Sequence, residues 1–290
     1  MSEVDFIAPT SPEQAARALL AGGATARPLG GGTDLLVQLR SGRLPPGLIV
    51  DIKRIPEAIG IRQEAGGFVI GAATPGITLS EHAALGQAWP GVVEGANLIG
   101  STQVQGRASM AGNLCNASPA ADSVPALVAA RATCLIVGPE GRRTAPVESI
   151  AVAPGRTSLA PGEFVLEILL PPRPARSADA YLRMIPRTEM DIAVVGAGVN
   201  LTLDANGVIS DAHVALGAVG PTVILATEAA AAIIGSKLDD EALARLDAAA
   251  RAVCRPISDK RGTSEFRTKI AGVLARRAAV IAYGRAEKTA

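Results

Sequence analysis

Three consecutive glycines follow a short apolar run near the N-terminus, in the stretch ARPLGGGTDLLVQLRSG (26–42). Without Cβ atoms, Gly30, Gly31 and Gly32 let the backbone turn tightly and come very close to another group. Thr33 adds a hydroxyl, and a helix that begins at Asp34 would add the positive end of its dipole. These features suit a pyrophosphate. Taken alone, the stretch is explained equally well as a plain glycine turn.

The spacing of these glycines excludes two common phosphate-binding patterns. There is no G-x-G-x-x-G sequence within a βαβ unit that ends in a ribose-binding acid, so the dinucleotide fingerprint is absent. No Gly-Lys-Ser/Thr follows the glycines, which excludes a Walker A loop.

A second stretch, ASMAGNLCNASPAAD (108–122), combines small and hydrogen-bonding residues with hardly any bulk. Such a loop can wrap closely around a flat ligand and bond it through the backbone and the Asn side chains. Asp122 has two compatible roles. It can accept a hydrogen bond from a ribose hydroxyl, or it can cap the helix predicted over SVPALVAA (123–130).

Composition limits the class of protein to which this chain can belong and the kinds of site that it can form. Hydrophobic residues make up 48% of the 290 residues but aromatic residues only 2%, so the core must consist of Ala, Val, Leu and Ile. The net charge is +1, which argues against a nucleic-acid partner. Cys115, Cys134 and Cys254 form no CxxC pair, so neither a disulfide framework nor a zinc or iron–sulfur site is expected from this chain alone.

No targeting or membrane segment is expected. The stretch MSEVDFIAPT lacks a charged-then-apolar signal pattern. The longest apolar stretch, 212–234, is interrupted by His213, Pro221 and Glu228 and does not indicate a membrane span. The sequence therefore predicts a cytoplasmic chain.

Periodicity and turn residues predict an α+β chain in three parts, 1–55, 56–175 and 176–290. The first part holds a helix opened by Ser11, Pro12 and Gln14, followed by strands at 26–29 and 47–53. In the second part we expect strand, turn and helix over 66–85, with Ser80 as the helix cap. A hairpin at 139–141 and a buried strand at 162–171 follow. The cluster PPRPARSADA (171–180) is the predicted linker.

The third part alternates apolar with small or polar residues on both sides of DANG (204–207). Asn206–Gly207 predicts a type I′ hairpin turn. From residue 227 onward the pattern is helical and rich in Ala.

The two small-residue stretches together resemble the FAD-binding medium subunit of the molybdenum hydroxylases, the xanthine dehydrogenase and carbon monoxide dehydrogenase family. In that family a short Gly-rich loop precedes an N-terminal helix, and a T/S-x-G-G-N segment follows later. The corresponding stretches here are LGGGTDLL and SMAGNLCNASPAAD. Three further stretches agree with family motifs: GRTSLAPGEFV (155–165), YLRMIPRTEMDIAVVGAGV (181–199) and GTSEFRTKIAGVLARRA (262–278).

The resemblance implies a fold and its domains. We expect an α+β chain with a two-part FAD-binding domain of the vanillyl-alcohol-oxidase type, in subdomains 1–55 and 56–175. A smaller C-terminal domain with an antiparallel sheet and helices should occupy 176–290.

The resemblance also implies an FAD site without catalytic residues or metal ligands of its own. Residues 28–35 would line the diphosphate and adenosine side, Ile99 would lie against the cofactor, and Ser109, Asn113 and Asp122 would bond it. Val165 and Arg183 would complete the pocket near the flavin. No His or Cys is placed for a covalent flavin bond. The full predicted set is Pro28, Leu29, Gly30, Gly31, Gly32, Thr33, Asp34, Leu35, Ile99, Ser109, Met110, Ala111, Gly112, Asn113, Asp122, Val165 and Arg183.

The sequence departs from the family pattern at several points. Ala111 replaces the first glycine of the usual Gly-Gly pair, and GGGTD stands where the carbon monoxide branch has AGGHS. The stretch GNLCNASPAAD leans toward the xanthine dehydrogenase and hydroxybenzoyl-CoA reductase branches. The flavin subunit of the latter carries an inserted four-cysteine cluster loop, which this sequence lacks.

The partners follow from the same resemblance. A small subunit with two [2Fe–2S] clusters would deliver electrons from a large molybdopterin subunit, in a dimer of heterotrimers, and the flavin would pass them to NAD or another acceptor. Two other interpretations stay open. A stand-alone FAD-dependent oxidoreductase of the same fold needs a proton donor for its substrate, for which the sequence offers no candidate. A glycine-turn scaffold would bind no cofactor at all.

Overall fold

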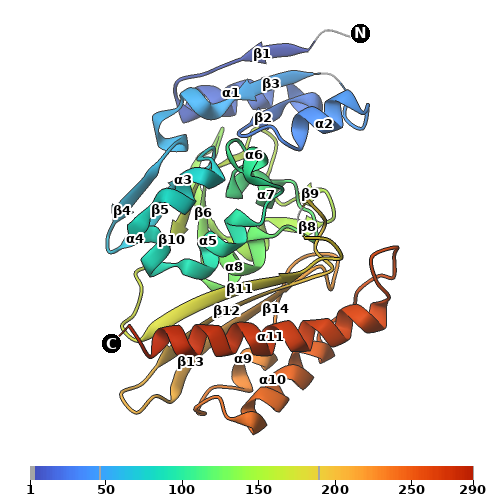
Figure 1. Cartoon of the computed structure of the whole chain (residues 1–290). Coiled ribbons are helices and arrows are strands. Elements are labelled where there is room, and N and C mark those ends of the chain that lie inside the picture. Colours follow the sequence, from blue (N-terminus) through green and yellow to red (C-terminus); the bar gives the residue numbers. More distant parts are fainter. Residues whose placement is uncertain (1–3, 46, 189, 290) are drawn as a thin grey trace.

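A computed structural model describes residues 4–45, 47–188 and 190–289. Residues 1–3 of the N-terminal stretch and Glu189 of the 181–199 motif lie outside this range. The chain forms three units stacked from the N-terminus to the C-terminal helices (Figure 1). The first unit is parallel and the other two are antiparallel.

The first unit is a three-stranded parallel sheet in the order β1-β3-β2. Helix α1 begins where Ser11 Oγ accepts from the backbone N–H of Gln14 at 3.3 Å, as predicted. Gln14 Oε1 accepts from the N–H of Thr10, so the reciprocal bond reaches one residue further back than in a standard capping box. The elements are β1 (Asp5–Ile7), α1 (Pro12–Ala21), β2 (Arg27–Leu29), α2 (Leu35–Arg40) and β3 (Leu48–Asp51), with 3₁₀ turns at Gly23–Thr25, Ile52–Arg54 and Pro56–Ala58.

The second unit is a five-stranded antiparallel sheet with β10 at its centre, in the order β4-β5-β10-β6-β7. The predicted hairpin at 139–141 joins β6 to β7. The strands are β4 (Ile61–Glu64), β5 (Gly67–Gly71), β6 (Thr133–Gly138), β7 (Gly141–Pro146) and β10 (Phe164–Leu170), with a small β8 (Ala151–Ala153) and β9 (Arg156–Thr157) pair and a 3₁₀ turn at Val147–Ser149. The helices are α3 (Gly76–Glu81), α4 (Ala83–Ala88), α5 (Pro90–Asn97), α6 (Thr102–Gln105), α7 (Met110–Cys115) and α8 (Ser123–Ala129).

The predicted cap at Ser80 is wrong. Helix α3 already begins after Pro75, so Ser80 lies inside it and bonds back to the carbonyl of Gly76. The cap of the next helix, α4, is His82, whose Nδ1 accepts from the N–H of Leu85 at 3.1 Å.

The third unit is a four-stranded antiparallel sheet in the order β11-β12-β13-β14. Helices α5 and α8 pack against this sheet from the second unit, and the long helix α11 also packs along β11 and β12 (Figure 1). The elements are β11 (Ser177–Met184), β12 (Val195–Leu203), β13 (Ile209–Gly217), β14 (Ile224–Leu225), α9 (Thr227–Ala231), α10 (Asp240–Ala252) and α11 (Ser264–Ala286).

Two local predictions in this region need correction. Residues 177–180 of the expected linker form the buried start of β11, because the small side chains of SADA fit beneath α5 and α11. At the β12–β13 hairpin, Gly207 has φ +77° but Asn206 has no positive φ, so the turn is not type I′. Asp204 Oδ1 instead accepts from the N–H groups of Asn206 and Val208, both at 2.8 Å, and fixes a longer turn.

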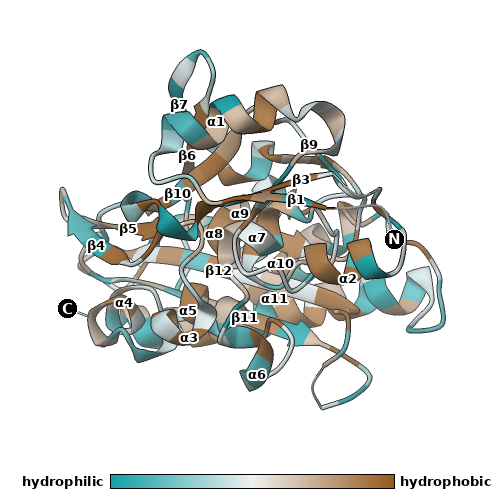
Figure 2. Cartoon of the chain, turned by 90° about the horizontal axis from the view of Figure 1, so that it is seen from above, coloured by the Kyte–Doolittle hydropathy of each residue, from teal (hydrophilic) through white to brown (hydrophobic). Residues whose placement is uncertain are grey.

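The interior divides into two cores. One fills the first two units, and the other lies between the third sheet and helices α9–α11. Ala, Val, Leu and Ile predominate in both, as the composition predicts, with Trp89 and Phe164 among the largest buried side chains. The hydrophobic strand β10 runs through the interior, whereas β4 at the sheet edge is hydrophilic (Figure 2). No helix in the described part of the chain is both long and apolar enough to cross a membrane.

Candidate functional site: a cavity between two small-residue loops

A cavity of about 310 Å³ lies where the glycine stretch meets the 108–116 segment. The fold thus brings together two sequence stretches that are far apart in the chain. Most of the predicted site residues line this cavity: Pro28, Leu29, Gly30, Gly31, Gly32, Thr33, Asp34, Leu35, Ile99, Ser109, Ala111, Gly112, Asn113 and Val165. Met110, Asp122 and Arg183 do not.

Two positions of the glycine loop exclude a side chain, each for a different steric reason. At Gly31, a Cβ atom would overlap the carbonyl oxygen of Arg107, so this residue is the contact point between the two loops. At Gly32, φ is +81° and a Cβ would stand 2.8 Å from Leu29 Cδ1. Gly31 is therefore required by backbone packing beside the cavity, and Gly32 by the turn itself.

The backbone of this loop leaves hydrogen-bond donors free. Among the described residues, no acceptor bonds the N–H groups of Gly31, Gly32, Thr33 or Asp34. The N–H of Ala111, in the first turn of α7, also has no partner there. All five residues line the cavity. Clustered free amides form a site for an anion such as a phosphate.

Two polar side chains of the 108–116 segment already make hydrogen bonds within the protein. Ser109 Oγ accepts from the N–H of Gly112 at 3.2 Å and caps α7. Asn113 Oδ1 accepts from the backbone N–H and the hydroxyl of Ser123, at 3.2 and 2.8 Å. Each side chain keeps a hydrogen-bond donor for a ligand: the hydroxyl hydrogen of Ser109 and the amide nitrogen of Asn113.

A side-chain bridge crosses from the first unit to the second. Gln38 Nε2 in α2 donates to Asn116 Oδ1, which follows α7, at 2.9 Å, and both residues line the cavity. Asn116 belongs to the small-residue stretch 108–122, whereas Gln38 is not among the residues that the sequence predicts for the site.

One wall of the cavity is apolar and contains Ile99, Leu159, Phe164 and Val165. Strand β10 has a β-bulge between Val165 and Glu167, where its register with β6 shifts. This wall offers a surface for a planar ring system, and the placement of Ile99 and Val165 beside the cofactor stays a prediction.

Sequence reasoning missed several lining residues. Gly155, Leu159 and Phe164 belong to GRTSLAPGEFV, so that motif could have indicated them. Arg27 and Gln38 belong to the glycine stretch 26–42, and Ala108, Cys115 and Asn116 to the small-residue stretch, but none is in the predicted set. Leu44, Ile52 and Ala72 come from segments without a recognisable motif.

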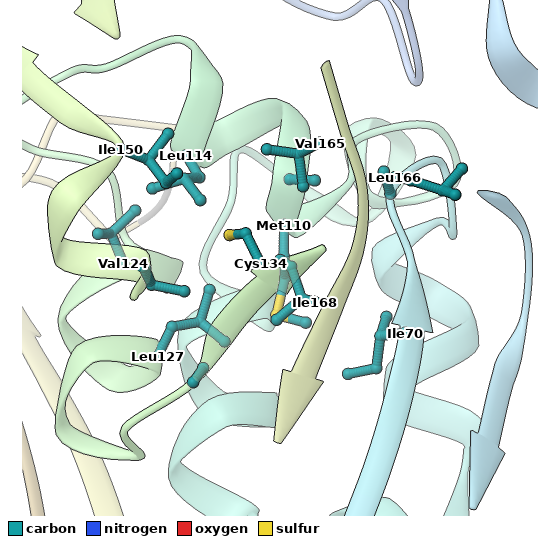
Figure 3. Packing of buried hydrophobic residues seen from close by; sticks show 14 of the residues in the cluster. Ile70, Met110, Leu114, Val124, Leu127, Cys134, Ile150, Val165, Leu166 and Ile168 are labelled. Carbon is teal, nitrogen blue, oxygen red and sulfur yellow. The ribbon is translucent and has the colours of Figure 1, made fainter. Parts of the chain in front are cut away.

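Met110 is a core residue. Its side chain is only 2% exposed and points into the interior, close to Cys134 and Ile168 (Figure 3). The short helix α7 directs Met110 and Leu114 into the core, while Ser109 and Ala111 line the cavity.

Asp122 and Arg183 form a buried ion pair outside the cavity lining. Arg183 Nη1 lies 2.7 Å from Asp122 Oδ2 and donates to the carbonyl of Leu98, next to Ile99, at 2.8 Å. The Tyr181 hydroxyl donates to Asp122 Oδ1 at 3.3 Å. Asp122 stands at the N-cap position of α8 but makes no cap bond, so the capping interpretation is wrong. Burial raises the pKa of Asp122 to about 6, against the opposing effect of Arg183.

Cys115 lines the cavity and is half-buried. Burial raises the pKa of its thiol to about 12, so the thiol is neutral near pH 7. Within the part of the chain that the structure describes, no group of three His, Cys, Asp or Glu side chains is arranged to hold a metal ion. His82 and His213 lie outside the cavity lining, at a helix cap and in a strand.

Comparison with known families shows the family to which this chain belongs. Residues 2–173 match the model for the FAD binding domain in molybdopterin dehydrogenase. The chain belongs to this family. Residues 180–282 of this flavoprotein match the CO dehydrogenase flavoprotein C-terminal domain. The recognition made from the sequence motifs is therefore confirmed.

Two known relatives are similar in sequence over most of the chain. The flavoprotein is 33% identical to the carbon monoxide dehydrogenase medium chain of Afipia carboxidovorans, over 98% of both chains. It is 32% identical to the putative xanthine dehydrogenase FAD-binding subunit of Escherichia coli, over 86% of both. These two identities are nearly equal, so they give no preference for the xanthine dehydrogenase branch.

The fold is also similar to that of a solved structure. The structure of carbon monoxide dehydrogenase from Hydrogenophaga pseudoflava superposes with a TM-score of 0.93 at 32% identity, over 98% of both chains. The predicted fold class, an FAD-binding domain followed by a C-terminal domain with mixed helices and antiparallel sheet, is confirmed. The flavoprotein is thus an FAD-binding oxidoreductase subunit of the molybdenum hydroxylase type.

Proposed function

We propose that this flavoprotein holds FAD in the cavity between the glycine loop and the 108–116 segment, as the electron-transfer subunit of a molybdenum hydroxylase. The observation that carries the proposal is the group of free amides at Gly31, Gly32, Thr33 and Asp34. A diphosphate needs several donors at close range, and a loop without Cβ atoms allows that approach. The residues present therefore fit the cofactor.

Each part of the cavity has a separate task in this proposal. Residues 28–35 bind the diphosphate and the adenosine side, and Ser109 and Asn113 supply further donors. Ile99 and Val165 form the wall against the flavin ring. Asp122 and Arg183 help to position that wall, because Arg183 donates a hydrogen bond to the Leu98 carbonyl next to Ile99. Their direct contact with the cofactor stays a prediction.

FAD, when bound, would supply the redox chemistry that connects the [2Fe–2S] clusters of a small partner subunit with NAD or another acceptor. A large molybdopterin subunit would complete a heterotrimer, and two heterotrimers a dimer. The relatives support such partners, since one is named a medium chain and another an FAD-binding subunit. The domain boundaries at 55 and 175 and the cytoplasmic location stay predictions.

Purification tests this assignment. The full chain alone should show flavin absorption bands, and acid precipitation should release the flavin to the supernatant. It should oxidise no purine, aldehyde or aromatic substrate until the iron–sulfur and molybdenum subunits are added. Iron and molybdenum should co-purify with this chain when it is isolated in its complex. Substrate oxidation by this chain alone, at the rate of the complex, would favour a stand-alone flavoenzyme. A colourless chain that takes up no FAD would exclude both.

A further inference from the structure

Lys53 makes an unusual contact with the glycine loop. Its Nζ donates to the carbonyl oxygen of Gly30 at 3.1 Å and to Asp51 Oδ1 at 2.7 Å. Asp51 Oδ1 also accepts from the backbone N–H of Lys53 at 3.0 Å. The Lys53 side chain is 29% exposed and that of Asp51 only 14%, so the ammonium is tied down rather than extended into solvent.

The sheet geometry explains why Lys53 reaches this carbonyl. Strands β2 and β3 are parallel, and Leu29 is paired with Asp51. The chain therefore leaves β2 at Gly30 beside the point where it leaves β3 toward Lys53. Both segments lie at the carboxyl edge of the sheet, the edge at which ligands bind in parallel α/β structures.

The Gly30–Gly31 peptide group is the part of the loop that most needs an external restraint. With a glycine on each side, its plane can rotate between orientations that residues with a Cβ atom would forbid. The peptide is trans, so its C=O and N–H groups point in opposite directions. A bond that fixes the Gly30 carbonyl therefore also fixes the direction of the Gly31 N–H, which is one of the free amides.

We propose that Lys53 is a positioning residue for the cofactor loop: its ammonium holds the Gly30 carbonyl and so keeps the Gly31 amide directed toward the ligand. This inference rests on the proposed FAD site. Gly31 is restrained on its other side by the backbone of Arg107, so the peptide group is held at two points. Lys53 does not line the cavity, and its action passes through the peptide plane.

The test compares FAD dissociation constants of the full chain after flavin removal, followed by flavin fluorescence. Lys53→Met should weaken binding by about tenfold, which corresponds to about 1.4 kcal/mol. Lys53→Arg, which keeps a cationic donor, should restore most of the affinity. Arg54→Met is the matched control, because Arg54 is the neighbouring exposed cation and is not among the lining residues.

Salt separates positioning from simple charge attraction. In 1 M NaCl the Debye length is about 3 Å, so an ammonium that only attracts the diphosphate through solvent would lose its effect. The defect of Lys53→Met should persist there. If Lys53→Met binds like Arg54→Met, or if its defect disappears in high salt, the inference is wrong.

Should Lys53→Met fail to fold, Asp51→Asn releases the same ammonium and should weaken FAD binding in the same direction; unchanged binding would refute the inference. A wild-type chain that binds no FAD would instead refute the proposed function.

Discussion

Gly31 and Arg107 lie in direct backbone contact, so that any side chain at Gly31 would overlap the Arg107 carbonyl oxygen. This contact joins the two loops that surround the cavity. Gly31 is therefore more than part of a turn, because the position of one loop depends on the absence of a Cβ atom in the other.

Gly31→Val should weaken FAD binding by at least about tenfold, since overpacking or backbone strain of about 1–3 kcal/mol must be relieved by moving one loop. The sequence suggests a clash with the phosphate and an unchanged fold. The structure places the clash at Arg107, so we also expect a lower melting temperature of the flavin-free chain. Gly86→Ala is the matched control, because nothing lies within 4 Å of a Cβ there. Equal flavin occupancy and stability of both variants would contradict this account of the loop.

Met110→Ala should destabilise the flavin-free chain by about 2–5 kcal/mol, as expected for truncation of a large buried side chain. The comparison variant is Met190→Ala, since Met190 is 52% exposed and should change stability by less than about 0.5 kcal/mol. Urea unfolding measures both. A stable Met110→Ala chain with impaired FAD binding would contradict this and show that Met110 belongs to the cofactor site, as the sequence predicts.

Asp122 should make stability depend on pH. Its pKa is raised from 3.8 to about 6 by burial, so the folded chain keeps a proton that the unfolded chain loses earlier. The free energy of unfolding should therefore fall as pH rises between those two values. Asp179, whose pKa is also raised to about 6 by burial, contributes in the same direction.

The difference in unfolding free energy between the wild type and Asp122→Asn isolates the contribution of Asp122. Wild type should lose stability relative to Asp122→Asn as pH rises from 4 to 6. A difference that stays constant would mean that the Arg183 ion pair keeps the pKa of Asp122 at its ordinary value.

The parts of the site that sequence reasoning predicts are those whose chemistry is local. The glycine loop and Ser109–Asn113 carry their donors and their missing side chains in consecutive residues, so their pattern is readable. Asp122 is different, because its partner Arg183 is 61 residues away and only the packing of β11 against the second unit brings them together.

The misplacement of Met110 and the omission of Lys53 and Gln38 have the same origin. Met110 is directed inward because α7 packs against α8 and β10, which no local pattern shows. Lys53, in the 3₁₀ turn Ile52–Arg54, bonds Gly30, and Gln38, in α2, bonds Asn116, and both contacts arise from tertiary structure alone. By contrast, α1 and the hairpin at 139–141 follow from turn and capping residues and are predicted correctly.

The most direct test of the FAD site is backbone hydrogen exchange of the full chain with and without FAD, followed by mass spectrometry. The account predicts slower exchange in peptides that cover 29–35 and 109–116, and no change in α10, which lies in the third unit away from the cavity. FAD binding with protection confined to other segments, or with none in the glycine loop, would contradict the account.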